Sequence, residues 1–166
     1  MRHLPFLVAA IMVLSCGVVG AQGADECANA QPINLTAPGT VAVAIDNTTA
    51  TSSNPPLPAP TTCAALGTVE SDVWFSWTAP STGLLTLSTC VNPGLLDTDI
   101  VLYDDSAGGG CGALTEVACD GDTAGCANFG SVVDSAPVTG GVTYFVRVGG
   151  WDAASVGTTR VYPTST

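Results

Sequence analysis

Lysine is absent from this chain of 166 residues, and its one histidine, His3, lies at the N-terminus. A serine or cysteine nucleophile needs a neighbouring base such as histidine, and a Schiff base needs a lysine amine. After residue 21 the chain therefore cannot form a Ser-His-Asp triad, a Cys-His pair or a Schiff base. We predict that the protein is not an enzyme. The alternative is a secreted, glycosidase-like hydrolase that depends on a pair of carboxylates.

Positive charge of any kind is scarce. After residue 21 the only basic residues are Arg147 and Arg160, against fourteen aspartates and glutamates, which gives a net charge of −12. Phosphate backbones and anionic lipid head groups would be repelled, so neither nucleic acid nor an anionic membrane surface is an expected partner. A large net negative charge instead favours the binding of divalent cations. Because 46% of the residues are hydrophobic, the chain can build a core and is not a disordered acidic tail.

The N-terminus has the pattern of a secretory signal. Arg2 and His3 precede an almost wholly apolar run over residues 4–19. Either Val19-Gly20-Ala21 or Ala21-Gln22-Gly23 then offers small residues at the −3 and −1 positions of a cleavage site. This order of a basic segment, an apolar segment and small residues is typical of a cleaved signal peptide. The apolar run is shorter than the roughly 20 residues that a membrane span needs, so we expect no membrane span.

The predicted organisation is a signal peptide over residues 1–21, cleaved near residues 21–23, and a single mature domain over residues 22–166. This predicts a protein that is secreted or displayed at the cell surface. The alternative is a lipoprotein signal in which Cys16 is the lipidated residue.

Cysteines are the main covalent feature of the mature chain. An even number in an exported protein predicts up to three disulfides. The absence of histidine and of a close Cys-x-x-Cys pair argues against a zinc site. The six candidates are Cys27, Cys63, Cys90, Cys111, Cys119 and Cys126.

The pairing of these cysteines is only partly constrained. If an extended strand separates Cys111 from Cys119, the two lie about 26 Å apart and cannot be bonded to each other. The pairs that the spacing favours are Cys90 with Cys119 or Cys126, and Cys27 with Cys63.

Alternating apolar residues predict short strands throughout the mature chain, and no amphipathic helix is expected there. Turn residues separate the strands, and a proline-rich stretch over residues 48–62 predicts a long surface loop. The fold class is therefore all-β, an antiparallel, jelly-roll-like β-sandwich of about eight or nine strands stapled by disulfides. The predicted strands cover residues 39–46, 72–79, 84–90, 98–103, 114–119, 132–138, 142–148 and 157–162.

An acidic hairpin is the strongest candidate site. The stretch Leu96–Cys126 holds seven of the fourteen acidic residues. In an antiparallel hairpin the start of the first arm lies beside the end of the second. Calcium takes six to eight oxygen ligands, which clustered carboxylates and loop carbonyls can supply. The alternative is that these aspartates only cap turns. The predicted calcium ligands are Asp97, Asp99, Asp120 and Asp122.

Tryptophans are the candidate ligand-binding residues. Trp74 points to the opposite side of its strand from Val73 and Phe75, and Trp151 precedes Asp152 in a predicted loop. Exposed indole rings stack on sugars, so Trp74, Trp151 and Asp152 predict a site for a polysaccharide or another extracellular polymer. The alternative is that the tryptophans are buried in the core.

Arg147 lies on the opposite side of its strand from Val142, Tyr144, Val146 and Val148. With so many carboxylates in the chain, we expect it to form a structural salt bridge.

From Asp72 onward the chain resembles the bacterial pre-peptidase C-terminal (PPC-like) domains. Such domains are jelly-roll-like β-sandwiches, usually non-catalytic parts of secreted proteases and other exported proteins, and some relatives bind calcium or extracellular polymers. The resemblance thus implies an exported binding or structural module. It rests on the order of DVWFSWTAP (72–80), Thr82-Gly83, LSTC (87–90), DTDIVLYD (97–104), residues 114–122 and YFVRVGG (144–150), preceded by DECANA (25–30), which is similar to the start of the cysteine-containing version.

Overall fold

The computed structural model describes residues 23–35, 42–53, 63, 66–90 and 96–165. The predicted signal peptide, its cleavage site and Cys16 lie outside these residues. Within them the chain forms nine strands and three short 3-10 turns. The strands are β1 (Gln31–Pro32), β2 (Val43–Asp46), β3 (Glu70–Thr78), β4 (Gly83–Ser88), β5 (Thr98–Asp104), β6 (Thr115–Asp120), β7 (Val132–Val138), β8 (Thr143–Gly150) and β9 (Thr158–Ser165), and the turns are η1 (Cys27–Asn29), η2 (Gly110–Gly112) and η3 (Ala127–Phe129).

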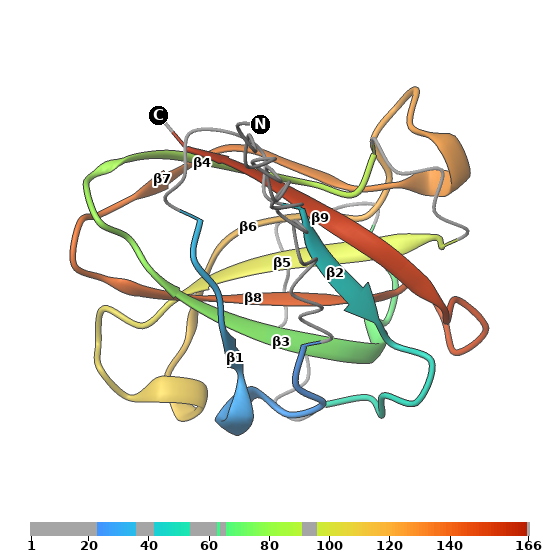
Figure 1. Cartoon of the computed structure of the whole chain (residues 1–166), viewed down its shortest axis with the longest axis horizontal. Helices are drawn as coiled ribbons and strands as arrows, with labels where there is room; N and C mark the ends of the chain where they lie inside the picture. Colours follow the sequence, from blue (N-terminus) through green and yellow to red (C-terminus); the bar gives the residue numbers. More distant parts are fainter. Residues whose placement is uncertain (1–22, 36–41, 54–62, 64–65, 91–95, 166) are drawn as a thin grey trace, which may run out of the picture.

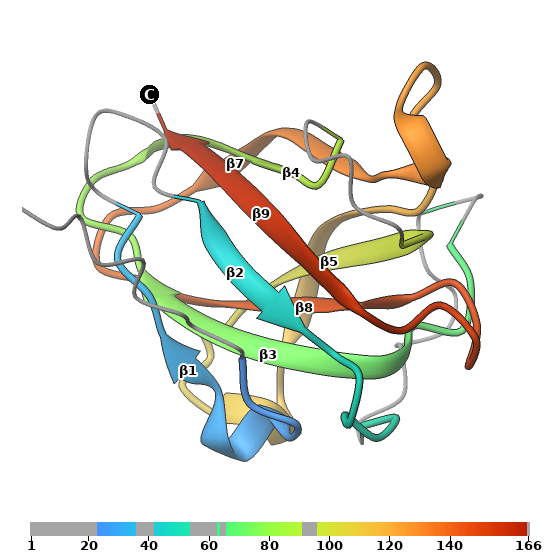
Figure 2. The same cartoon turned by 45° about the vertical axis from the view of Figure 1, so that its right-hand side comes forward.

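The strands form two stacked sheets. One has five strands in the order β1-β3-β8-β5-β6, and the other has four in the order β2-β9-β4-β7. All neighbouring strands are antiparallel except β1 and β3, which are parallel. Figures 1 and 2 show β9 and β2 crossing in front of β8 and β3. The predicted antiparallel β-sandwich is confirmed. β1 was not expected, because a two-residue strand that contains a proline has no alternating pattern.

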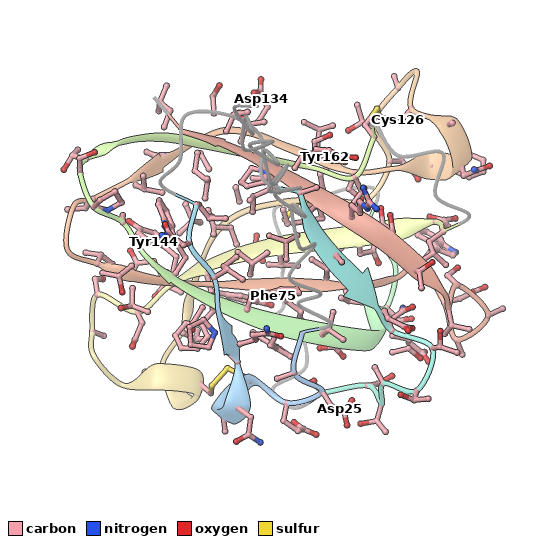
Figure 3. All side chains as sticks on the ribbon, viewed as in Figure 1. Asp25, Phe75, Cys126, Asp134, Tyr144 and Tyr162 are labelled. Carbon is pink, nitrogen blue, oxygen red and sulfur yellow. A yellow bond between two sulfur atoms is a disulfide. The ribbon has the colours of Figure 1, made fainter. Side chains whose placement is uncertain are left out.

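The main core lies between the two sheets. Alternate residues of each strand point inward, as Val73, Phe75 and Trp77 do on β3, where none is more than 3% exposed. Figure 3 labels Phe75 and Tyr144 among these core side chains. Burying a large apolar side chain stabilises a fold by about 1.5–3 kcal/mol. This core therefore provides the bulk of the stability that holds the two sheets together.

A second buried cluster lies on the other face of the five-stranded sheet. Its members are covered by residues 24–30, by residues 66–69 and by the loop that contains η2. Backbone bonds in both directions join Ala24 to Trp74, with N···O distances of 2.7 and 3.1 Å. A face that would otherwise meet solvent is thus closed by a third layer. The cluster comprises Cys27, Val69, Trp74, Val101 and Tyr103.

Arg147 is the charged centre of this third layer. It is 2% exposed, and its Nε donates to Oδ2 of Asp72, which is 0% exposed, at 2.8 Å. A second guanidinium nitrogen donates to the carbonyl oxygen of Val69 at 3.3 Å. The guanidinium also lies 5.3 Å from the ring centre of Trp74, which stacks on Tyr103 at 5.6 Å. Burial raises the pKa of Tyr103 to about 12, against the opposing effect of Arg147. The predicted structural salt bridge is confirmed.

Replacing either Arg147 or Asp72 alone should lower the free energy of unfolding substantially. Arg147→Met leaves the Asp72 carboxylate buried without its partner, which typically costs about 3–5 kcal/mol. We expect a correspondingly lower midpoint in urea denaturation. The double variant Arg147→Met/Asp72→Leu removes both charges and should recover most of the loss. Arg160→Met, at an exposed arginine, is the control and should change stability by less than about 0.5 kcal/mol. A loss in Arg147→Met no larger than in Arg160→Met would contradict the assignment.

Candidate functional site

Several connections meet at one end of the sandwich, which we call the loop end. β3 begins and β8 ends there, because Glu70 pairs with Gly150, and β5 begins there, because Thr98 pairs with the same glycine. β6 also ends there, with Asp120 opposite Ile100. In Figure 1 the β6–β7 and β8–β9 loops project from the right-hand end of the molecule. The acidic residues and the loop tryptophan predicted from the sequence therefore lie at the same end.

Asp99 is the most buried carboxylate of the loop end. Its side chain is 0% exposed, and its Oδ2 accepts hydrogen bonds from the amides of Gly67 at 3.0 Å and Val69 at 3.3 Å. Its Oδ1 is buried and has no hydrogen-bond partner among the described residues. The pKa of Asp99 is raised to about 6, mainly by burial and also by the charges of Asp97 and Asp122, against the opposing effect of the two amide hydrogen bonds.

Asp97 has a similar environment, two residues earlier on the same side of the chain. Its Oδ1 is also buried and has no hydrogen-bond partner within the described residues. Burial raises the pKa of Asp97, and the charges of Asp122 and Asp152 add to the effect. Asp97, Asp99, Asp122 and Asp152 therefore create a strongly negative potential around two unpartnered carboxylate oxygens.

Asp120 does not belong to this group, which corrects the expectation that four aspartates converge. Asp120 lies opposite Ile100, a core residue, so its side chain points toward the space between the two sheets. Its Oδ2 accepts hydrogen bonds from the amide of Val132 at 2.8 Å and from the hydroxyl of Thr123 at 2.7 Å. Hairpin pairing brings all four residues to one end, but the alternation of side chains separates Asp120 from Asp99. Within the described parts of the chain, no three His, Cys, Asp or Glu side chains are placed to hold a metal ion.

Trp151 lies in the loop after β8 and is 41% exposed. Its amide donates to the carbonyl oxygen of Asp97 at 3.1 Å, and its carbonyl accepts from the amide of Thr68 at 3.1 Å. Asp152 closes the loop, because its Oδ1 accepts from the amides of Ala154 and Ser155 at 2.9 and 3.0 Å. The structure thus holds an accessible indole on a backbone that is fixed on both sides.

Trp74, the other tryptophan predicted to bind a ligand, is fully buried. Its Nε1 donates to the hydroxyl of Ser53 at 2.8 Å, and its ring lies beneath the third layer. It cannot stack on a sugar, so this prediction is wrong. Alternation correctly placed Trp74 on the face opposite Val73, but it contains no information on whether that face is covered.

Phe129 is an exposed aromatic residue of the loop end that the sequence analysis missed. Its side chain is 63% exposed, and both Asn128 and Phe129 have positive φ, at 53° and 55°. The Cys90–Cys126 disulfide bounds this loop. Such a conformation is unfavourable for a bulky residue. The available signal in the sequence was an aromatic residue between Cys126 and Gly130 that lies outside any alternating apolar run.

The three disulfides are Cys27–Cys111, Cys63–Cys119 and Cys90–Cys126, with Cα–Cα distances of 5.9, 5.8 and 5.0 Å. The predicted set of six cysteines in three bonds is confirmed, and Cys90 has one of its two expected partners. The Cys27–Cys63 pairing is wrong. Both cysteines are instead bonded to the β5–β6 hairpin, Cys27 to Cys111 in the connecting loop and Cys63 to Cys119 on β6.

The raised pKa of Asp99 predicts how stability depends on pH. Because its folded-state pKa is about 6 and its ordinary value is 3.8, the folded state binds the proton more tightly, and stability falls as the pH rises from about 4 to about 6. In EDTA, we expect a loss of about 1 kcal/mol from this group between about pH 5 and pH 7, seen as a lower Tm.

Asp99→Asn tests this directly, because an amide keeps the oxygen that accepts from Gly67 and Val69 but does not ionise. The variant should show a flatter pH dependence of Tm than the wild type. Asp134→Asn, at an exposed carboxylate on β7, should keep the wild-type dependence. An unchanged slope in Asp99→Asn would contradict the prediction.

Comparison with known proteins identifies one family. The model of a T9SS-associated family (T9SS, type IX secretion system), described as galactose binding domain-like, matches residues 23–160. No curated protein and no solved structure matches the chain. The family match agrees with the β-sandwich class that the PPC-like resemblance implied, whereas the PPC-like identity itself stays a prediction. In the described residues, no helix is long and apolar enough to cross a membrane.

Proposed function

The chain belongs to the T9SS-associated family of galactose-binding-domain-like proteins, and from this premise we propose that it is an exported, non-catalytic module that binds a carbohydrate polymer outside the cell or at its surface. The family is associated with a secretion system, and its members are typically non-catalytic. The three disulfides fit an oxidising compartment outside the cytoplasm.

The observation that carries this proposal is the exposed indole of Trp151. Both backbone hydrogen-bonding groups of this residue are bonded to neighbouring segments, so little conformational entropy is lost when a ligand stacks on the ring. Asp122 and Asp152 are exposed nearby and offer carboxylate oxygens to sugar hydroxyls. A flat aromatic surface beside hydrogen-bond acceptors is the usual chemistry of a carbohydrate-binding surface.

The carboxylate-dependent hydrolase is the weaker candidate. A carboxyl group with a pKa of about 6, as in Asp99, would suit a general acid. However, a general acid must reach the glycosidic oxygen, and Asp99 is 0% exposed with one oxygen already bonded to two amides. Hydrolysis of a bound glycan would be the outcome that favours this candidate.

Calcium is the second part of the proposal. The fit rests on the two buried, unpartnered oxygens of Asp97 and Asp99. Because no third acidic side chain is placed to join them in the described residues, an ion here would take its remaining ligands from backbone carbonyls and water, which calcium accepts readily. Bound calcium would compensate the two buried charges and stabilise the loop end.

Trp151→Ala tests the carbohydrate part. The purified mature protein is screened for retention on a glycan and extracellular-polymer array. We expect the variant to stay folded and to bind any retained polymer roughly tenfold or more weakly, as is usual when a central aromatic contact is lost. Leu84→Ala is the matched control, because Leu84 is 45% exposed on β4; it should bind normally. Equal retention by both variants would exclude Trp151 from the site.

Calcium removal tests the second part. At a calcium concentration about a hundredfold above Kd, the folded state gains about 2.7 kcal/mol, so Tm should be higher in calcium than in EDTA. Asp97→Asn and Asp99→Asn should lose this response. Asp120→Asn should keep it, because Asp120 is bonded to Val132 and Thr123 instead. The calcium assignment fails if the Tm of the wild type is the same in calcium and in EDTA.

A further inference from the structure

The backbone contacts of the Trp151 loop lead to Asp97 and Asp99. The amide of Trp151 bonds to the carbonyl of Asp97, and the carbonyl of Trp151 accepts from the amide and the hydroxyl of Thr68, at 3.1 and 3.3 Å. Thr68 lies between Gly67 and Val69, whose amides both donate to Asp99. Each backbone bond of Trp151 therefore ends on a residue whose position depends on Asp97 or Asp99.

The packing between these segments is close. A Cβ on Gly67 would lie 2.3 Å from the carbonyl oxygen of Trp151 and 2.8 Å from Cε3 of its indole. Val69 has a φ of 50°, which is unfavourable for a β-branched side chain and persists only where the surroundings impose it. The indole thus rests directly on the strained segment that Asp99 holds, so a displacement of that segment must move the ring.

The protein supplies little positive charge to this region. After residue 21 its only basic residues are Arg147 and Arg160, and Arg147 is bonded to Asp72. Asp122 and Asp152 add negative charge beside Asp97. The Oδ1 atoms of Asp97 and Asp99 are buried without a hydrogen bond among the described residues, which is unfavourable for an ionised carboxylate that has no counter-charge. Compensation must come from solution, and hard carboxylate oxygens select a hard divalent cation.

We propose that a divalent cation of the calcium class, bound through Asp97 and Asp99, fixes the position of Trp151, so that carbohydrate binding depends on the cation. This inference rests on the proposed function, since it names how the same site is controlled. With the cation bound, the 67–69 segment and the Trp151 loop are held in the arrangement described above. Without it, repulsion between the carboxylates loosens both segments.

Tryptophan fluorescence gives a readout that does not require a glycan. Trp74 and Trp77 are at most 3% exposed, so quenching by acrylamide reports mainly on Trp151. In the wild type, calcium should reduce the quenching constant about twofold relative to EDTA, as the population of the ordered loop increases. The Trp151→Phe, Asp97→Asn and Asp99→Asn variants should show no calcium effect. Asp97 is partly exposed, so Asp97→Asn keeps the test valid if Asp99→Asn does not fold.

Asp134→Asn is the matched control. Asp134 is an exposed carboxylate on the four-stranded sheet, away from the β8–β9 loop (Figure 3), and its variant should respond to calcium as the wild type does. If calcium raises Tm but leaves the quenching of Trp151 unchanged, the coupling is overturned.

Glycan retention, measured with calcium and with EDTA, separates this inference from the proposed function. A loss of at least about tenfold in EDTA and in Asp97→Asn supports the coupling. Equal retention in calcium and EDTA overturns the coupling and leaves carbohydrate binding intact. A calcium-dependent change at Trp151 without retention of any polymer supports the coupling of cation and loop and contradicts the proposed carbohydrate function.

Discussion

The buried pair of Arg147 and Asp72 is the constraint on which the third layer depends. A two-layer sandwich normally leaves the outer faces of its sheets in water, where an arginine needs no partner. Here the guanidinium is covered, so every segment above it must supply a hydrogen-bond acceptor or an aromatic face. Asp72 also accepts from the amide of Ser53 at 2.7 Å, and Ser53 bonds in turn to the indole of Trp74. Segments that are far apart in the sequence thus meet around the guanidinium group of Arg147.

The same pair anchors one end of the segment that leads from the loop end into β3. Residues 66–72 lie between two anchors: Asp72, which is bonded to Arg147, and Asp99, which accepts from the amides of Gly67 and Val69. Gly149 allows β8 to approach this segment closely, because a Cβ at position 149 would lie 2.9 Å from the carbonyl oxygen of Glu70. Trp151 lies two residues after Gly149, in the loop that follows β8. The Trp151 indole therefore lies beside the same segment, residues 67–69, whose Val69 carbonyl accepts from the buried arginine.

The sequence determined the strands better than it determined the site. Alternation identified which side chains of β3 and β8 face the core, because that pattern is a local property of an extended chain. It could not show that Trp74 is covered, since the cover comes from residues around Ala24 and from distant disulfides. Hairpin pairing placed Asp120 at the correct end but not on the correct face. Cys27 was assigned a wrong partner because its true partner, Cys111, lies across a layer that no local pattern encodes.

The scarcity of basic residues links the composition to the chemistry of the loop end. A chain with lysines could neutralise Asp97 and Asp99 from within, and such a pair would then be an ordinary salt bridge. In this chain one of the two arginines after residue 21 is committed to Asp72. The pKa values of Asp97 and Asp99 are raised, so both carboxylates hold a proton more tightly than usual, and the proposed calcium ion would offset the same charge. At neutral pH, above the pKa of about 6 for Asp99, the proton is largely lost, and the proposed cation would compensate the remaining charge.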